Sequence, residues 1–221
     1  MAELRKAKNP FRFYSRLHLT ELTGYKAVNI MQLLALIKKV PGSSIYHHTH
    51  RFLQQHLYLS PEPPNDFAYW VREFLSEDEL GERLACIDTL EFTTIRDLRE
   101  KIIEVIETYL EDKPQVKLKF ANAGEEFHFV KSVSFIFPTS YVASDLKEFV
   151  EILKKITIDS IYFHIFEARL RLEKGENDFS YWIATSLENK KLAEEISQLD
   201  PYTRTLDELR KTLIRIIEKH I

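Results

Sequence analysis

The chain has 221 residues, of which 44% are hydrophobic and 29% charged, and its formal net charge is -3. This composition describes a folded chain that can build one large core or two small ones, and it excludes a disordered protein. The balanced charge lacks the basic excess of nucleic-acid-binding proteins, and no apolar run approaches the roughly 18 residues that span a bilayer.

The single cysteine, Cys86, excludes a disulfide within the chain and fits a reducing compartment. The charged N-terminal segment is not followed by an apolar run of signal-peptide length. We therefore expect a cytoplasmic protein. Few Cys and Met residues beside many Lys and Glu favour a thermophilic source.

Two short sequences occur twice in the chain. SIYHH at 44–48 returns as SIYFH at 160–164, a shift of 116 residues, and NDFAYW at 65–70 returns as NDFSYW at 177–182. The shift falls to 112 for the second pair because the first copy carries four extra residues around its PEPP sequence. These matches predict an internal repeat.

The repeat predicts two related units of about a hundred residues each. The first repeat covers 8–111, the junction covers 112–126, and the second repeat covers 127–221. Because two fused copies mimic a twofold dimer, we expect the repeats to pack about a pseudo-twofold axis.

Extended structure is indicated in a few places along the chain. Apolar residues alternate with other residues over 11–19 and again over 133–137, which is the period of a strand. At the junction, 116–120 alternates apolar and basic residues, and 127–129 follows after a glycine-containing turn. This order predicts a small β-hairpin at the junction.

Helical spacing of apolar residues dominates the rest of each repeat. In the first repeat the expected helices run from Tyr25 to Val40, from an N-cap at Ser44, from an N-cap at Asn65, from Leu80 to Ile87, and from about Thr94 to Leu110. Asn177 is the matching N-cap in the second repeat. The predicted fold class is mainly α, with two tandem units of about five helices each and a small β-hairpin at the junction.

A repeated histidine lies on the inward stripe of the second helix of each repeat. In the first repeat, Asp66 begins the next helix and could reach His48. One interpretation is a buried His–Asp link that fixes two helices, because buried polar groups need partners. The other is a ligand pocket lined by His48, Asp66, Tyr69 and Trp70, with an equivalent formed by His164, Asp178, Tyr181 and Trp182.

The first repeat has additional histidines that could hold a metal. His47 and His50 are three residues apart on one helix, close enough to share an ion, and Asp66 or Glu62 could add a carboxylate. His56 lies about two turns from His48, and no HExxH or CxxC motif is present. The alternative is a solvated histidine-rich face, and the sequence leaves any cofactor unknown.

Ser44 and Ser160 each precede a repeated histidine by one turn, so a Ser, His, Asp set can be drawn in each repeat. We interpret both serines as helix N-caps instead. The chain has no Gly-x-Ser-x-Gly elbow and no glycine-rich oxyanion loop.

Four sequences together resemble a family of uncharacterised prokaryotic proteins that is classed as a domain of unknown function. They are SSIYHHTHRFL, SPEPPNDFAYW, LGERLACID and LREKIIEVIE. The resemblance covers 11–110 well and 127–221 more loosely. It implies no established activity, so it assigns no catalytic residue.

These observations predict a non-enzymatic helical binding or regulatory module with a polar His/Asp/aromatic pocket. The alternative is an enzyme of the first repeat that uses a metal or His/Asp acid–base chemistry. We expect a protein or small-molecule partner, neither nucleic acid nor membrane, and a homo-oligomer is compatible with the sequence.

Overall fold

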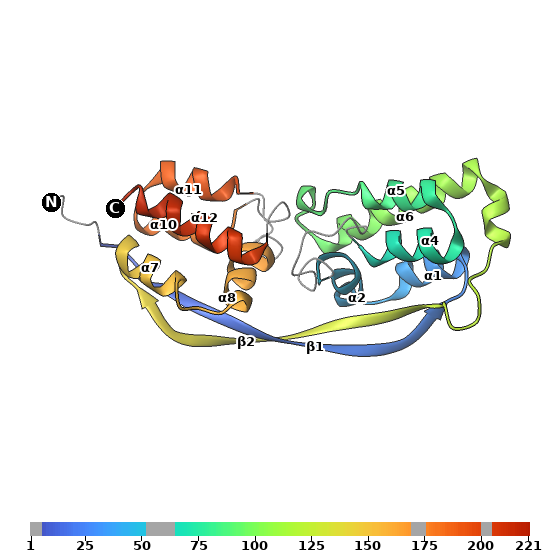
Figure 1. The fold of residues 1–221 in the computed structure, drawn as a ribbon, viewed down its shortest axis with the longest axis horizontal. Helices are drawn as coiled ribbons and strands as arrows, with labels where there is room; N and C mark the ends of the chain where they lie inside the picture. The colour runs from blue at the N-terminus through green and yellow to red at the C-terminus, as the bar shows by residue number, and fades with distance from the viewer. Residues whose placement is uncertain (1–5, 52–64, 169–175, 200–204) are drawn as a thin grey trace. The chain divides into compact units, whose positions relative to one another are not determined.

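The computed structural model describes residues 6–51, 65–168, 176–199 and 205–221 (Figure 1). Its sheet consists of two antiparallel strands of 17 residues each, β1 (Phe11–Ala27) and β2 (Phe127–Ala143), drawn side by side in Figure 1. The predicted fold class, mainly α with only a small hairpin, is therefore wrong. The strands pair across about 100 residues of intervening chain, whereas a hairpin joins neighbours in sequence.

The junction also differs from the prediction. Residues Pro114–Leu118 form a 3-10 helix, η3, in place of a strand. Pro114 suits the first turn of such a helix because that position needs no N–H. Val116 is buried while Leu118 is 79% exposed, so the apolar alternation here does not mark one buried face.

Helices follow each strand. After β1 come α1 (Ile30–Lys39), α2 (Gly42–Tyr46), the π-helix η1 (His47–Arg51), α4 (Asp66–Leu75), α5 (Asp78–Ala85), the 3-10 helix η2 (Thr89–Glu91) and α6 (Ile95–Asp112). After β2 come α7 (Leu146–Leu153), α8 (Ile158–Tyr162), the π-helix η4 (Phe163–Glu167), α10 (Asp178–Ser186), α11 (Lys190–Ser197) and α12 (Leu206–Glu218). The side chains of Asn65, Thr94 and Asn177 accept N–H groups of the first turns of α4, α6 and α10, which confirms these predicted helix starts.

The first helix begins later than predicted. Strand β1 continues through Tyr25 to Ala27, and Asn29 caps α1 by accepting from the Gln32 N–H at 2.9 Å. The prediction read Tyr25 as helical because the apolar spacing of α1 extends backwards by chance into the strand.

The chain forms two compact units that do not coincide with the two predicted repeats. Unit 1 contains Met1–Leu17, Leu57–Leu59 and Ser134–Ile221, and unit 2 contains His18–His56 and Ser60–Val133. Both strands are divided between the units. Each unit therefore combines the helices of one predicted repeat with the first part of the strand that begins the other predicted repeat.

Unit 2 buries the start of β2 among the helices of the first repeat. The ring of Phe127 lies 5.2 Å from that of Phe67 and 5.8 Å from that of Trp70, both on α4. Phe129 is fully buried in the same core. Burying such aromatic side chains contributes about 2–3 kcal/mol each.

Unit 1 buries the start of β1 among the helices of the second repeat. The ring of Phe11 lies 5.4 Å from that of Phe149 on α7 and 5.5 Å from that of Trp182 on α10. Phe13 is fully buried and lies 5.1 Å from Phe149. Each unit thus buries the start of a strand that belongs to the other predicted repeat.

Candidate functional site

His48, the histidine of unit 2 that was predicted to face inward, is hydrogen-bonded at both ring nitrogens. Val130 of β2 donates its backbone N–H to His48 Nε2 at 3.0 Å, and His48 Nδ1 lies 2.7 Å from Asp66 Oδ2. A ring that accepts at Nε2 carries its proton at Nδ1, so His48 is neutral and donates to the Asp66 carboxylate. Asp66 lies in the first turn of α4, where a carboxylate is favoured by the helix dipole.

The same arrangement recurs in unit 1. Tyr14 of β1 donates its backbone N–H to His164 Nε2 at 2.9 Å, and His164 Nδ1 lies 2.7 Å from Asp178 Oδ2. Asp178 lies in the first turn of α10. Each histidine therefore connects a strand backbone to the start of a helix.

The repeated serines bind the same strand residues as the histidines. Ser44 Oγ donates to the Val130 carbonyl oxygen at 2.8 Å, and Ser160 Oγ donates to the Tyr14 carbonyl oxygen at 2.6 Å. A serine and a histidine one turn apart thus hold both backbone groups of one strand residue. We call Ser44, His48 and Asp66, and likewise Ser160, His164 and Asp178, a strand clamp.

The interpretation of these serines as N-caps is wrong. Pro41 occupies the N-cap position of α2, and Thr157 caps α8 by accepting from the Ser160 N–H. Both serines lie inside their helices, where a hydroxyl can reach an adjacent strand. Because each hydroxyl hydrogen is given to a carbonyl oxygen, this Ser, His, Asp set is arranged to hold a strand rather than to activate a nucleophile.

The two tryptophans anchor the chain just before each strand. Trp70 Nε1 donates to the Glu125 carbonyl oxygen at 2.7 Å, and Trp182 Nε1 donates to the Asn9 carbonyl oxygen at 2.8 Å. These acceptors precede β2 and β1 by two residues each. Every tryptophan therefore binds the segment that leads into the strand of the other repeat.

The residues predicted to line a pocket are only partly brought together. In unit 2 the ring of Phe127 lies between two of them, 4.7 Å from the His48 ring and 5.8 Å from the Trp70 ring. Tyr69 and its counterpart Tyr181 are 38% and 45% exposed, with the Tyr69 ring beside Phe74. The histidine and the tryptophan thus lie beside a strand residue, the aspartate binds the histidine, and the tyrosines are partly exposed.

His47 and His50, two of the additional histidines of the first predicted repeat, are buried in unit 2. His47 Nδ1 lies 3.1 Å from Ser132 Oγ on β2, and His50 Nδ1 lies 2.9 Å from Thr49 Oγ1. Because Thr49 gives its hydroxyl hydrogen to the Ile45 carbonyl oxygen, His50 is the donor to Thr49 and carries its lone pair on Nε2. Burial lowers the pKa of His50 from 6.5 to about 4, so its ring is neutral at pH 7.

Aromatic stacking through Tyr46 joins His50 to a third histidine, His18. The ring of Tyr46 lies 5.3 Å from that of His50 and 6.1 Å from that of His18 on β1. We call the set of His18, Tyr46, His47, His50 and Ser132 the histidine cluster. Sequence reasoning missed His18 and Ser132, since both come from the strands and join the cluster only through long-range pairing.

The corresponding place in unit 1 has different chemistry. Phe163 and Phe166 stand where the first repeat has His47 and His50, and the Phe166 ring is stacked on Tyr162 at 4.6 Å. Arg16 of β1 is buried, forms an ion pair with Glu167 and places its guanidinium 4.2 Å from the Tyr162 ring centroid. Unit 1 therefore replaces imidazoles by phenyl rings and a buried ion pair.

One set of potential metal ligands occurs within the described residues. Ligand atoms of His47, His48 and Asp66 lie within 4.8 Å of one another. A metal at His48 would have to replace the Val130 N–H at Nε2 or the proton shared with Asp66. The predicted pair His47 and His50 is hydrogen-bonded to Ser132 and Thr49 through Nδ1. His56, Glu62 and the PEPP sequence lie outside the described residues.

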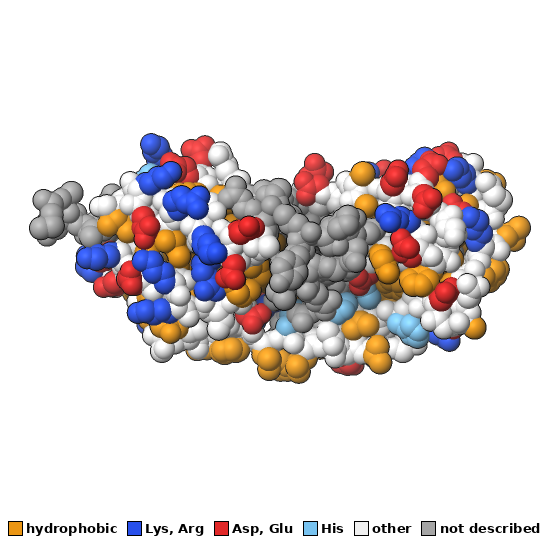
Figure 2. Space-filling view, viewed as in Figure 1, with side chains coloured by type: hydrophobic (Ala, Val, Ile, Leu, Met, Phe, Trp, Pro, Cys, Tyr) orange, Lys and Arg blue, Asp and Glu red, His pale blue; other side chains and the backbone are white. Residues whose placement is uncertain are grey.

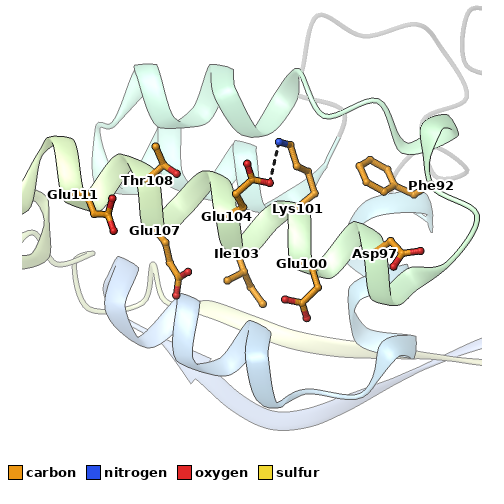
Figure 3. Close-up of a pocket in the computed structure, with 9 residues that line it drawn as sticks. All are labelled: Phe92, Asp97, Glu100, Lys101, Ile103, Glu104, Glu107, Thr108 and Glu111. Carbon is orange, nitrogen blue, oxygen red and sulfur yellow. Dashed lines mark hydrogen bonds and ion pairs between the residues drawn. The ribbon is translucent and has the colours of Figure 1, made fainter.

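Sequence reasoning also missed an acidic groove along α6 (Figure 3), which has a volume of about 550 Å³. The acidic residues that line the groove are Asp97, Glu100, Glu104, Glu107 and Glu111. Their spacing of three and four residues is the sequence signal that indicates one acidic helix face. Two of them are paired with lysines, Glu104 with Lys101 at 3.0 Å and Glu107 with Lys38 at 2.5 Å. The remainder form the charged outer face of the helix.

Comparisons with known proteins agree with this architecture. The chain is similar to OrfY from Thermoproteus tenax, a solved structure, with 30% sequence identity, a TM-score of 0.82 and 98% of each chain covered. No curated protein matches the chain. Among the helices in the described ranges, none has both the length and the apolar content to cross a bilayer. A model of the family of unknown function DUF5752 matches residues 8–218, so the chain belongs to that family.

Proposed function

We propose that this protein is a non-enzymatic binding or regulatory module whose ligand site is the histidine cluster of unit 2. Unit 1 shares the strand clamp and serves as its structural counterpart. The proposal includes a cytoplasmic location, which the single cysteine supports. It also includes an origin of the chain in two fused copies. The hydrogen bonds from a strand N–H to His48 and to His164, which recur with a shift of 116 residues, support this origin.

The strand clamps support a function without acid–base catalysis. A general base needs a lone pair that can reach a substrate proton, and the Nε2 lone pair of His48 accepts the Val130 N–H. His164 is engaged in the same way by Tyr14. The geometry therefore favours a structural role for both His–Asp pairs.

The difference between the units is the observation that carries the proposal. Burying polar groups costs free energy unless they are well paired, and unit 1 has phenyl rings at the positions of His47 and His50. A framework that folds with phenylalanines does not need imidazoles for stability. Their presence in unit 2 is explained by a ligand that imidazole binds.

A divalent transition metal is the ligand class that fits this cluster best. Neutral imidazole is the common form of a histidine metal ligand, and His50 is held neutral by burial. Its Nδ1–H is held by Thr49, as metal-binding histidines are oriented by a hydrogen bond at their other ring nitrogen, so that the lone pair is on Nε2. His47 supplies the second imidazole.

Zinc titration of the full-length protein tests the proposal. We expect calorimetry at pH 7 to show about one equivalent of Zn²⁺ bound to the wild type, with affinity reduced at least about tenfold in His47→Phe/His50→Phe, which copies unit 1. The matched control is His128→Phe, at an exposed histidine of β2, which should bind like the wild type. Absence of binding, or equal binding by wild type and double variant, would remove the cluster as a metal site.

A further inference from the structure

Strand β2 carries an exposed apolar segment in unit 1. Phe135, Ile136 and Phe137 are 55%, 53% and 46% exposed. Consecutive side chains of a strand point to opposite faces, so the segment is apolar on both faces. Hydrophobic side chains gather beside the part of the molecule where β2 runs (Figures 1 and 2).

The segment also lacks the charges that usually protect a strand edge. Residues 134–144 contain no charged side chain. The counterparts of Ile136 and Phe137 in the first repeat are Thr20 and Glu21, and Glu21 is paired with Lys131 at 3.0 Å. Natural edge strands avoid pairing with other chains through such charged residues. Leu19, the counterpart of Phe135, is also 49% exposed, so the absence of charge is what distinguishes this segment of β2 from β1.

The backbone of this segment is oriented for pairing. Val130 directs both its N–H and its carbonyl oxygen away from β1, toward the strand clamp. Backbone direction alternates along a strand, so Ile136, six residues later, directs its two groups to the same outer edge. Pro138 has no N–H and limits such pairing to a few residues.

We propose that a second copy of this chain pairs with β2 at this edge, antiparallel and with a twofold axis at Ile136. Phe135 of one copy then lies opposite Phe137 of the other, so the same residues serve both sides of the contact. An uncharged strand meets its own copy without repulsion, whereas a charged partner finds no complementary charge here.

The available area sets the expected strength of the dimer. With Leu17, which is 54% exposed, the segment offers four half-exposed large side chains. At about 200 Å² for each such side chain they provide roughly 400 Å² of apolar area. A standard interface buries about 800 Å² on each partner, so we expect a weak dimer with a Kd in the micromolar range.

Sedimentation of the full-length protein from about 1 to about 200 μM tests this interface. The wild type is expected to shift toward twice its mass of 26.2 kDa as the concentration rises. Ile136→Lys should raise the dimer Kd at least about tenfold by placing two like charges opposite each other. Thr20→Lys, at the exposed equivalent position of β1, should dimerise like the wild type.

A cross-link makes the result independent of how well Ile136→Lys folds. In a Cys86→Ser background, a mixture of Phe135→Cys chains and Phe137→Cys chains should form an intermolecular disulfide on mild oxidation. A wild type that stays monomeric, a dimer that Ile136→Lys leaves intact, or failure to cross-link would overturn the proposal. Binding of a monomeric wild type to phospholipid vesicles through the same residues would also overturn it.

Discussion

At each strand clamp a single imidazole satisfies two polar groups, a strand amide and a helix-terminal carboxylate. His48 and His164 are both buried, and so are the serines one turn before them. A buried donor or acceptor that loses its partner costs about 1–3 kcal/mol. These residues are therefore explained by the docking of a strand against a helix.

His48→Ala should leave the Val130 amide without its acceptor and create a small cavity. We expect the free energy of unfolding to fall by about 3 kcal/mol. Hydrogen exchange should become faster at the Val130 amide, and by more than at the Tyr14 amide, which His164 holds. His128→Ala, at an exposed histidine, should change stability by less than about 0.5 kcal/mol. Unchanged protection of Val130 would contradict the clamp.

The buried His50 should make stability depend on pH. Its pKa is about 4 in the folded protein and near 6.5 when exposed, so the unfolded chain binds the proton more readily. Stability should therefore fall as the pH drops from about 6.5 to about 4, by at most about 3 kcal/mol, and His50 should contribute no further change below that range.

Urea unfolding of wild type and His50→Phe at pH 7, 5 and 4 measures this effect. The variant copies Phe166 of unit 1 and should lose less stability on acidification than the wild type. If both proteins lose stability equally, His50 is not held neutral by burial.

Some of these residue roles could be predicted from the sequence. The inward position of His48 followed from helical spacing, and its proximity to Asp66 followed from the helix start at Asn65. The second partner, Val130, could not be predicted because it comes from a strand about 80 residues away. Ser44 also binds Val130, and without that partner the sequence favours an N-cap role for Ser44, because a helix is predicted to begin there.

At the scale of elements, the exchanged strands determine what each helix packs against. Phe127 lies in the second predicted repeat but contacts Trp70 of the first, and Phe11 contacts Trp182 of the second. The chain has two tryptophans, one in each unit. Fluorescence can therefore report on each unit separately.

Phe127→Leu should alter the emission of Trp70, and Phe11→Leu should alter that of Trp182. The measurement uses Trp182→Phe and Trp70→Phe backgrounds, so that one tryptophan is read at a time. Each replacement removes an edge-on ring contact and should cost about 1–2 kcal/mol. A response of Trp182 to Phe127→Leu, with Trp70 unaffected, would mean that each strand packs within its own repeat.

The elements themselves were unequally predictable. Helices such as α4 and α6 follow from local spacing and capping residues, which act within a few positions. Strand pairing depends on segments far apart in the chain, and period-2 alternation shows a strand without its partner. The alternation over 11–19 and 133–137 indicates extended segments, but it does not show that the two segments pair with each other.

At the scale of the whole molecule, shared strands should couple the two units during unfolding. Each unit contains parts of both β1 and β2, so neither can lose its strand without affecting the other. In urea titrations, the fluorescence midpoint of the Trp70-only variant should equal that of the Trp182-only variant once the effect of the substitutions is removed. The far-UV ellipticity of each variant measures that effect. Two separate transitions within one variant would show independent units.

Cleavage of the junction tests the exchange of strands most directly. A protease site inserted after Ala123, in the exposed turn beside Gly124, cuts the chain between the helices of the first repeat and β2. Because each half holds the strand start of the other, we expect the cut protein to elute as one complex of both halves and to separate only in denaturant. Halves that elute separately as folded proteins would show that each repeat completes its own core, which would contradict the account.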